Sequence, residues 1–241
     1  MLTLLATALV VCAPGYPGSA AEAQPAMDAL ARELSKTSPV TASYEETAEG
    51  GMSKLKDAGL LLATLPFFLE HEHDLHLTAR LMAVPQGGQP LQKWTLVTGK
   101  DHPAALAGYA VQSLAGSSPR FVRAMSPAVP KNAAVSPGSS VLSGLRKASA
   151  GEKIALLLDG AQAASLSTLP FADKLSAVET SAPVPVAIVA TVGKRVSNWS
   201  ALEKAFSRVS GEALSGIQMT GFLKLDEAAL TAAREAWQRA K

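Results

Sequence analysis

Short apolar runs, rich in Leu, Val and Ala, alternate along this chain with segments whose apolar residues recur at helical spacing. The runs at 8–13, 59–63 and 153–158 are bounded by Gly, Pro or Asp-Gly, as buried strands of an α/β sheet usually are. Because helical patterns follow these runs, we predict an α/β fold with helices on both faces of the sheet. The chain has 241 residues, of which 48% are hydrophobic and 17% charged, so it can form a sizeable core and is not intrinsically disordered.

The charge and the motif content exclude several classes of function. The formal net charge is +2 and no run of Lys or Arg is longer than two, so we expect no nucleic-acid partner. The single cysteine excludes an intrachain disulfide and a cysteine-based zinc site. No apolar run reaches the roughly 18 residues of a membrane span. The sequence contains no Gly-x-Ser-x-Gly elbow, phosphate-loop lysine motif or His-Glu-x-x-His pair, so we expect neither an enzyme nor a bound cofactor.

The N-terminus allows two interpretations. Residues 1–11 (MLTLLATALVV) resemble the apolar part of a secretory signal peptide. The interpretation that we favour makes 8–13 a buried first strand and residues 1–6 the remnant of an export signal. The turn residues after this strand lead to Ser19 and Glu22, whose spacing predicts a capping box at the start of the first helix.

Further strands and helices are expected throughout the chain. We predict strands at 40–44, 77–84, 93–98, 109–113, 175–180 and 186–192. We predict helices at 52–57, from Pro66, and at 120–125, 141–149, 161–169, 200–209, 212–218 and 226–240. Pro25 predicts a kink or a later start of the first helix, because proline lacks the N–H that a helix interior needs. The Pro-rich segments at 85–90 and 181–185 suggest a chain that leaves one lobe and later returns to it.

Six segments together form a recognisable pattern. They are ALVVCAPGYPGSAAEAQPAMDALARELS (8–35), DAGLLLATLPFFL (57–69), ALAGYAVQSLAGSSPRFV (105–122), GEKIALLLDGAQ (151–162), ETSAPVPVAIVAT (179–191) and SGEALSGIQMTGFLKLDEAAL (210–230). In this order and spacing they resemble the periplasmic solute-binding proteins of ABC transporters, and most closely the phosphate- and phosphonate-binding group.

This resemblance implies a two-lobed periplasmic-binding-protein-like (type II) fold, with a ligand cleft between two α/β lobes that are joined by two crossing strands. Residues 1–86 and 184–241 would form one lobe, and 87–183 the other. The resemblance also implies an exported, periplasmic monomer that delivers a small, phosphate- or phosphonate-like anion to a membrane permease. A ligand-sensing lobe of a signalling system is an alternative.

Candidate ligand-binding residues lie in the loops that follow predicted strands. Ligands of open α/β sheets bind beyond the carboxyl ends of strands, where helix N-termini offer free N–H groups to anions. The candidates in three such loops are Gly15, Tyr16, Gly18, Ser19, Thr64, Leu65, Phe67, Ser117 and Ser118. By resemblance, Asp159 would receive a ligand amine or hydroxyl, and Ser181 at the second crossing is a further candidate. The competing interpretation is that these hydroxyls and Asp159 serve only as helix caps or turn residues.

A histidine cluster suggests a third function. His71, His73 and His76 lie among three carboxylates within seven residues, which is the composition of a zinc-binding segment. On a strand, His71 and His73 would share a face, but no single regular element points all three imidazoles inward. We therefore expect a solvated polar loop and no metal site, with a zinc-binding protein as the alternative.

Overall fold

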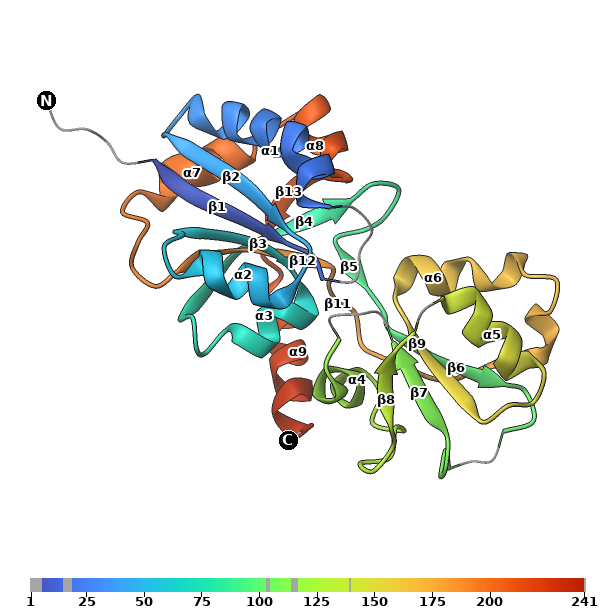
Figure 1. Cartoon of the computed structure of the whole chain (residues 1–241). Helices are drawn as coiled ribbons and strands as arrows, with labels where there is room; N and C mark the ends of the chain where they lie inside the picture. Colours follow the sequence, from blue (N-terminus) through green and yellow to red (C-terminus); the bar gives the residue numbers. More distant parts are fainter. Residues whose placement is uncertain (1–5, 15–18, 103–104, 114–116, 139, 241) are drawn as a thin grey trace, which may run out of the picture. The chain divides into compact units, whose positions relative to one another are not determined.

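The chain folds into two compact α/β units (Figure 1). The computed structural model describes residues 6–14, 19–102, 105–113, 117–138 and 140–240. Unit 1 comprises Met1–Pro90 and Pro185–Asp226, and unit 2 comprises Leu91–Val184 and Glu227–Lys241. Over the described ranges, no helix has both the length and the apolar character needed to cross a bilayer.

Unit 1 is built around a six-stranded mixed sheet with the strand order β13-β4-β12-β3-β1-β2. Its elements are β1 (Thr7–Cys12), α1 (Ala20–Ser35), β2 (Val40–Glu45), α2 (Ala48–Leu55), β3 (Leu60–Thr64), α3 (Leu65–His71), β4 (Leu77–Pro85), β12 (Ala187–Val192), α7 (Trp199–Phe206), α8 (Glu212–Gly216) and β13 (Met219–Lys224). β1 is parallel to both β2 and β3, so these strands end at one edge of the sheet. β12 is antiparallel to β3 and β4.

Helices cover both faces of this sheet. Figure 1 shows α1, α7 and α8 over one face and α2 and α3 over the other. On the first face, Met27, Leu30 and Leu34 of α1 pack into a core cluster with alternate residues of the strands. Helix α1 begins at Ala20 and continues through the exposed Pro25, so a start near Pro25 was wrong, and the expected kink stays a prediction. The capping box and the buried apolar face of α1 stabilise the helix although Pro25 lacks a backbone N–H.

Unit 2 contains a five-stranded sheet with the strand order β10-β6-β9-β7-β8. Its elements are β5 (Leu91–Gln92), β6 (Thr95–Gly99), β7 (Ala110–Ser113), α4 (Pro119–Met125), β8 (Val135–Pro137), α5 (Val141–Ser149), β9 (Ile154–Leu158), α6 (Gly160–Ala164), the 3-10 turns η1 (Leu166–Thr168) and η2 (Ala172–Lys174), β10 (Leu175–Thr180) and α9 (Glu227–Arg239). β5 pairs with β11 (Val184–Pro185), which follows β10. β7 is parallel to β8 and β9, so the carboxyl ends of these three strands share an edge.

The last helix, α9, belongs to unit 2, where it packs against α4. The guanidinium of Arg120 stacks 3.9 Å from the centroid of the Trp237 ring. Its Nε and Nη2 atoms donate hydrogen bonds of 3.2 and 3.0 Å to the Trp237 carbonyl oxygen. This carbonyl lies in the last turn of α9, where no intrahelical N–H is available to it. Arg120 therefore caps the end of α9 from another helix.

Two features of the chain path differ from the sequence analysis. The segment Met219–Lys224 forms the edge strand β13, where only flanking helices were expected. Its pattern is weak because Phe222 is its single buried residue, packed edge-to-face on Phe206 with ring centroids 4.9 Å apart. The chain also passes between the units three times rather than twice, because α9 follows β13 into unit 2. The sequence analysis expected residues 227–241 in the lobe of residues 1–86, whereas their contacts group them with unit 2 through the docking of α9 on α4.

Candidate functional site

In unit 1, the candidate loops follow the carboxyl ends of β1 and β3, which lie side by side in the sheet. The described residues do not include the candidates Gly15, Tyr16 and Gly18. Of the expected export-signal remnant, residues 1–6, only Ala6 is described. Ser19 is described, and its hydrogen bonds go to its own helix. Its N–H and Oγ donate to Glu22 Oε2 at 2.9 and 2.8 Å, and its Oγ accepts from the Glu22 N–H at 3.3 Å. The predicted capping box is thus confirmed.

The electrostatics of Glu22 reflect this cap. The hydrogen bonds from the Ser19 N–H and then from its hydroxyl hold the pKa of the Glu22 carboxyl below its usual value. The carboxylate also lies in the first turn of α1, where a negative charge interacts favourably with the helix dipole. Since the Ser19 hydroxyl already has a donor and an acceptor role in the cap, its ligand role stays a prediction.

The second loop of unit 1 leaves one polar side chain available. Thr64 ends β3 and precedes α3, but its half-buried side chain makes no capping hydrogen bond. The Leu65 N–H donates to the Val186 carbonyl at 3.3 Å. The side chains of Leu65 and Phe67 are buried in the core, so these two predicted site residues contribute packing. Thr64 is therefore the described residue of this loop that could offer a hydroxyl to a ligand.

In unit 2, the helices α4 and α6 begin beyond the ends of the neighbouring parallel strands β7 and β9. Ser118 is the N-cap of α4, and its Oγ accepts from the Phe121 N–H at 3.2 Å. Ser117 precedes it and is half-buried. The parallel register brings these two hydroxyls and Asp159 to the same sheet edge, as the sequence analysis expected for strand-end loops.

Asp159 is buried and forms a second capping box. Its Oδ1 accepts from the Gln162 N–H at 2.8 Å, and its own N–H donates to Gln162 Oε1 at 3.1 Å. The next residue, Gly160, donates its N–H to Gln92 Oε1 at 3.1 Å. These bonds support the competing interpretation of Asp159 as a helix cap, so its ligand role remains a prediction.

Ser181 attaches the returning segment to Trp94, which lies between β5 and β6. Its Oγ accepts from the Trp94 N–H at 2.9 Å and donates to the Ala182 carbonyl at 2.7 Å, while its own N–H donates to the Trp94 carbonyl at 2.8 Å. The Trp94 side chain is 2% exposed and packs edge-to-face on Phe121 at 5.0 Å between ring centroids. These hydrogen bonds give Ser181 a structural role at the second crossing, and its ligand role stays a prediction.

The histidine segment forms no metal-ligand cluster. Among the described residues, no group of three or more His, Cys, Asp or Glu side chains is placed to hold a metal ion. The His71 ring packs on Phe67 at 4.6 Å between centroids, and partial burial lowers the His71 pKa despite the opposing charges of Glu70 and Asp74. The side chain of His73 is 99% exposed. His76 is also exposed, with its ring centroid 6.5 Å from that of His73, whereas His71 is half-buried.

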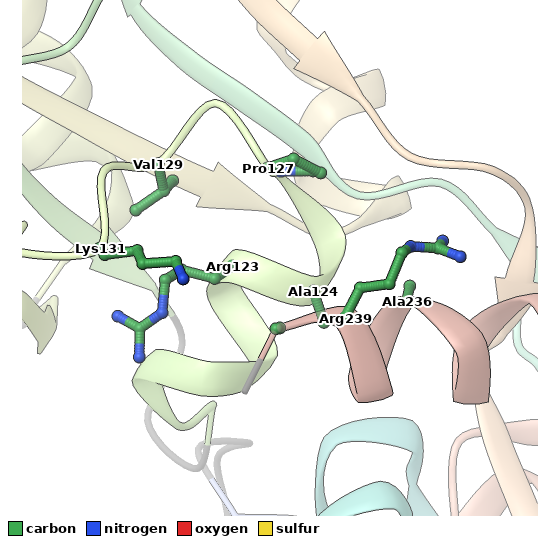
Figure 2. A pocket seen from close by; sticks show the side chains of 8 residues that line it. Arg123, Ala124, Pro127, Val129, Lys131, Ala236 and Arg239 are labelled. Carbon is green, nitrogen blue, oxygen red and sulfur yellow. The ribbon is translucent and has the colours of Figure 1, made fainter.

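A pocket that the sequence analysis did not anticipate lies within unit 2 (Figure 2). It has a volume of about 600 Å³ and is formed by the C-terminal half of α4, the loop after it and the end of α9. Its basic side chains are Arg123, Lys131 and Arg239. These residues are far apart in the sequence, so no local pattern could have identified them.

The comparisons with known proteins concern the fold. No protein-family model matches the sequence, and no curated protein does. XAC2383 from Xanthomonas citri, bound to ATP, matches with a TM-score of 0.75 and 16% identity over 98% of each chain. A binding protein component of an ABC phosphonate transporter from Pseudomonas aeruginosa matches with a TM-score of 0.62 and 15% identity over 98% of this chain and 88% of that one. PhnD1 from Prochlorococcus marinus, in complex with methylphosphonate, matches with a TM-score of 0.59 and 11% identity over 97% of this chain and 98% of that one.

These matches span nearly the whole chain, and they show the predicted two-lobed periplasmic-binding-protein fold.

Proposed function

We propose that this protein is an exported solute-binding protein that captures a small phosphate- or phosphonate-like anion for an ABC transporter. The observation that carries the proposal is the full-length structural match to proteins solved with ATP and with methylphosphonate. Both of these ligands carry an anionic phosphorus–oxygen group. A third match is a binding component of a phosphonate transporter, which connects the fold with delivery to a membrane permease.

The strand-end loops of each unit supply chemistry that suits such an anion. Thr64 in unit 1 and Ser117 and Ser118 in unit 2 place hydroxyl groups where helices begin. Hydroxyl and backbone N–H donors bind phosphate oxygens without a cationic side chain, because the first N–H groups of a helix carry a partial positive charge. In this proposal the Asp159 carboxylate accepts a hydrogen bond from an amine or hydroxyl of the ligand.

The proposed role is binding and delivery by a monomer, without catalysis. The ligand can shift the protein from an open to a closed conformation only if it binds the closed conformation more tightly. The free energy of closure therefore comes from this difference in affinity, and the ligand is released when the protein opens. This proposal requires no cofactor.

Titration calorimetry with methylphosphonate, inorganic phosphate, ATP and sulfate tests the ligand class. At about 100 times its dissociation constant, the true ligand should also raise the free energy of unfolding by roughly 2.7 kcal/mol. The proposal of an anionic solute is wrong if none of these oxyanions binds.

Hydroxyl-removing variants test the site. Thr64→Val and Ser118→Ala should each weaken binding by roughly 10- to 150-fold, since a hydrogen bond to a charged group contributes on the order of 1.5 to 3 kcal/mol. Ser118→Ala also removes a helix cap, so Ser140→Ala is the matched control. Ser140 caps α5 through a 3.3 Å bond from the Ser143 N–H and is not a candidate site residue. If both site variants bind as tightly as Ser140→Ala, the site assignment is wrong.

A further inference from the structure

The pocket of unit 2 gathers basic side chains and no acidic ones. Its lining contains Arg123, Lys131 and Arg239 but no Asp or Glu. Arg239 contacts the neighbouring Glu235 at 3.7 Å, in an exposed pair that contributes little. In the part of the chain that the structure describes, neither Arg123 nor Lys131 forms an ion pair. Arg123 and Lys131 lie on the same side of the pocket, so a bound anion would be attracted to both of them.

Helix dipoles explain two of the three cations. Arg123 and Arg239 lie in the last turns of α4 and α9, where the helix dipole favours a positive charge. Lys131 lies in the loop after α4, so it is not in the last turn of a helix and no helix dipole favours its charge. Its position in the same pocket is therefore the feature that calls for a ligand.

The size and the walls of the pocket indicate a small molecule. Its volume of about 600 Å³ is within the usual range for small-ligand sites. Figure 2 shows Arg123 and Lys131 together on one side of the pocket and Ala124 next to them, whereas the Arg239 side chain extends away from them on the other side, beside Ala236. The small side chain of Ala124 leaves room for a ligand beside Arg123 and Lys131. The Arg guanidinium matches phosphate with two parallel N–H donors, and the Lys ammonium adds a compact charge.

We propose that this pocket binds a small phosphate-bearing anion at a site separate from the strand-end loops. Ser118 lies at the N-terminal end of α4, whereas Arg123 and Ala124 lie in the C-terminal half of this helix. The recognised group is a phosphate, carried either by a free inorganic anion or by a nucleotide. The clamp of Arg120 on Trp237 holds α9 against α4 and thereby forms the pocket walls.

NMR titration of the full chain with inorganic pyrophosphate and, separately, with ADP tests this site. Amide shifts in α9 and in the loop after α4 should change saturably with pyrophosphate. Binding of pyrophosphate alone assigns the free inorganic anion, and binding of both assigns the phosphate group wherever it occurs. Binding of ADP alone would refute phosphate recognition. Raising the salt from about 0.05 to 0.5 M should weaken the binding, because the cations are partly exposed.

Matched double variants decide whether the pocket itself binds. Arg123→Gln with Lys131→Gln should weaken pyrophosphate binding by about tenfold or more. Arg146→Gln with Lys147→Gln removes the same charge from the exposed face of α5 and should change the affinity less than twofold. An equal loss in both pairs would reduce the effect to net charge and overturn the proposal. Thr64→Val, which changes a residue of unit 1 outside this pocket, should leave pyrophosphate binding intact, so failure of the pocket proposal is distinguishable from failure of the solute site.

Discussion

Replacing Arg120 with alanine removes the contacts that hold the end of α9 on α4. The variant loses the stacking on the Trp237 ring at 3.9 Å and two hydrogen bonds to the Trp237 carbonyl. A partly buried cation–π contact contributes about 1 to 2 kcal/mol, and a charged hydrogen bond about 1.5 to 3 kcal/mol. Because one side chain makes all three contacts, their contributions overlap and are not additive. We expect a loss of about 2 to 4 kcal/mol.

Hydrogen exchange followed residue by residue measures this loss where it occurs. Amides in the last two turns of α9 should exchange faster by a factor of roughly 30 to several hundred, since 1.4 kcal/mol corresponds to tenfold. The amides of β1 and β3 in unit 1 should keep their protection, because they make no contact that depends on Arg120. The local nature of the change separates undocking of α9 from a general loss of stability.

Two further variants control this experiment. Arg120→Lys keeps the charge but loses the planar guanidinium, so we expect an intermediate effect. Arg146→Ala removes an exposed arginine from the last turn of α5 and should leave α9 unchanged. Unchanged protection of α9 in Arg120→Ala would refute the reasoning that this clamp attaches the helix to unit 2.

Three other outcomes follow from contacts in unit 1. Arg195→Ala should lower the free energy of unfolding in urea by about 1 to 3 kcal/mol, because Arg195 Nη1 donates to the carbonyls of Leu55 and Ala58 at 2.8 and 3.0 Å; an unchanged urea midpoint would contradict this. Gly51→Ala should destabilise the protein, since a Cβ there would lie 2.5 Å from Cys12 Sγ, and the added change Cys12→Ala should restore most of the loss. Burial, and then the charge of Glu45, raises the pKa of the Cys12 thiol to about 12. Alkylation at pH 8 should therefore be slow in the folded protein and fast in urea, and above pH 9 stability should fall, because only the unfolded thiol then loses its proton.

The local sequence determined most of the elements. Apolar runs with turn residues at their ends placed β3, β9 and β12 within one or two residues of their observed bounds. The prediction of helix 141–149 was confirmed by α5 (Val141–Ser149). These successes share a cause, because periodicity and caps depend on neighbours a few residues away.

The candidate site was only partly accessible to such reasoning. A sequence identifies Ser19, Ser118 and Asp159 as cap residues, because cap positions are defined locally. It does not reveal that Ser181 bonds to Trp94 across 87 residues, or that Thr64 makes no capping bond. Those distinctions depend on the packing of segments that are distant in the chain.

The amino-acid order by itself determined the α/β class, the first capping box and the positions of most strands and helices. The tertiary structure alone decided that β13 closes the edge of the first sheet, that α9 joins unit 2, and that Arg123, Lys131 and Arg239 line one pocket. The physical reason is that local patterns specify which face of an element is buried. The partner that buries this face is selected by long-range contacts, such as that between Arg120 and Trp237. The free energies of these contacts depend on residues that are far apart in the chain, so a short stretch of sequence does not determine them.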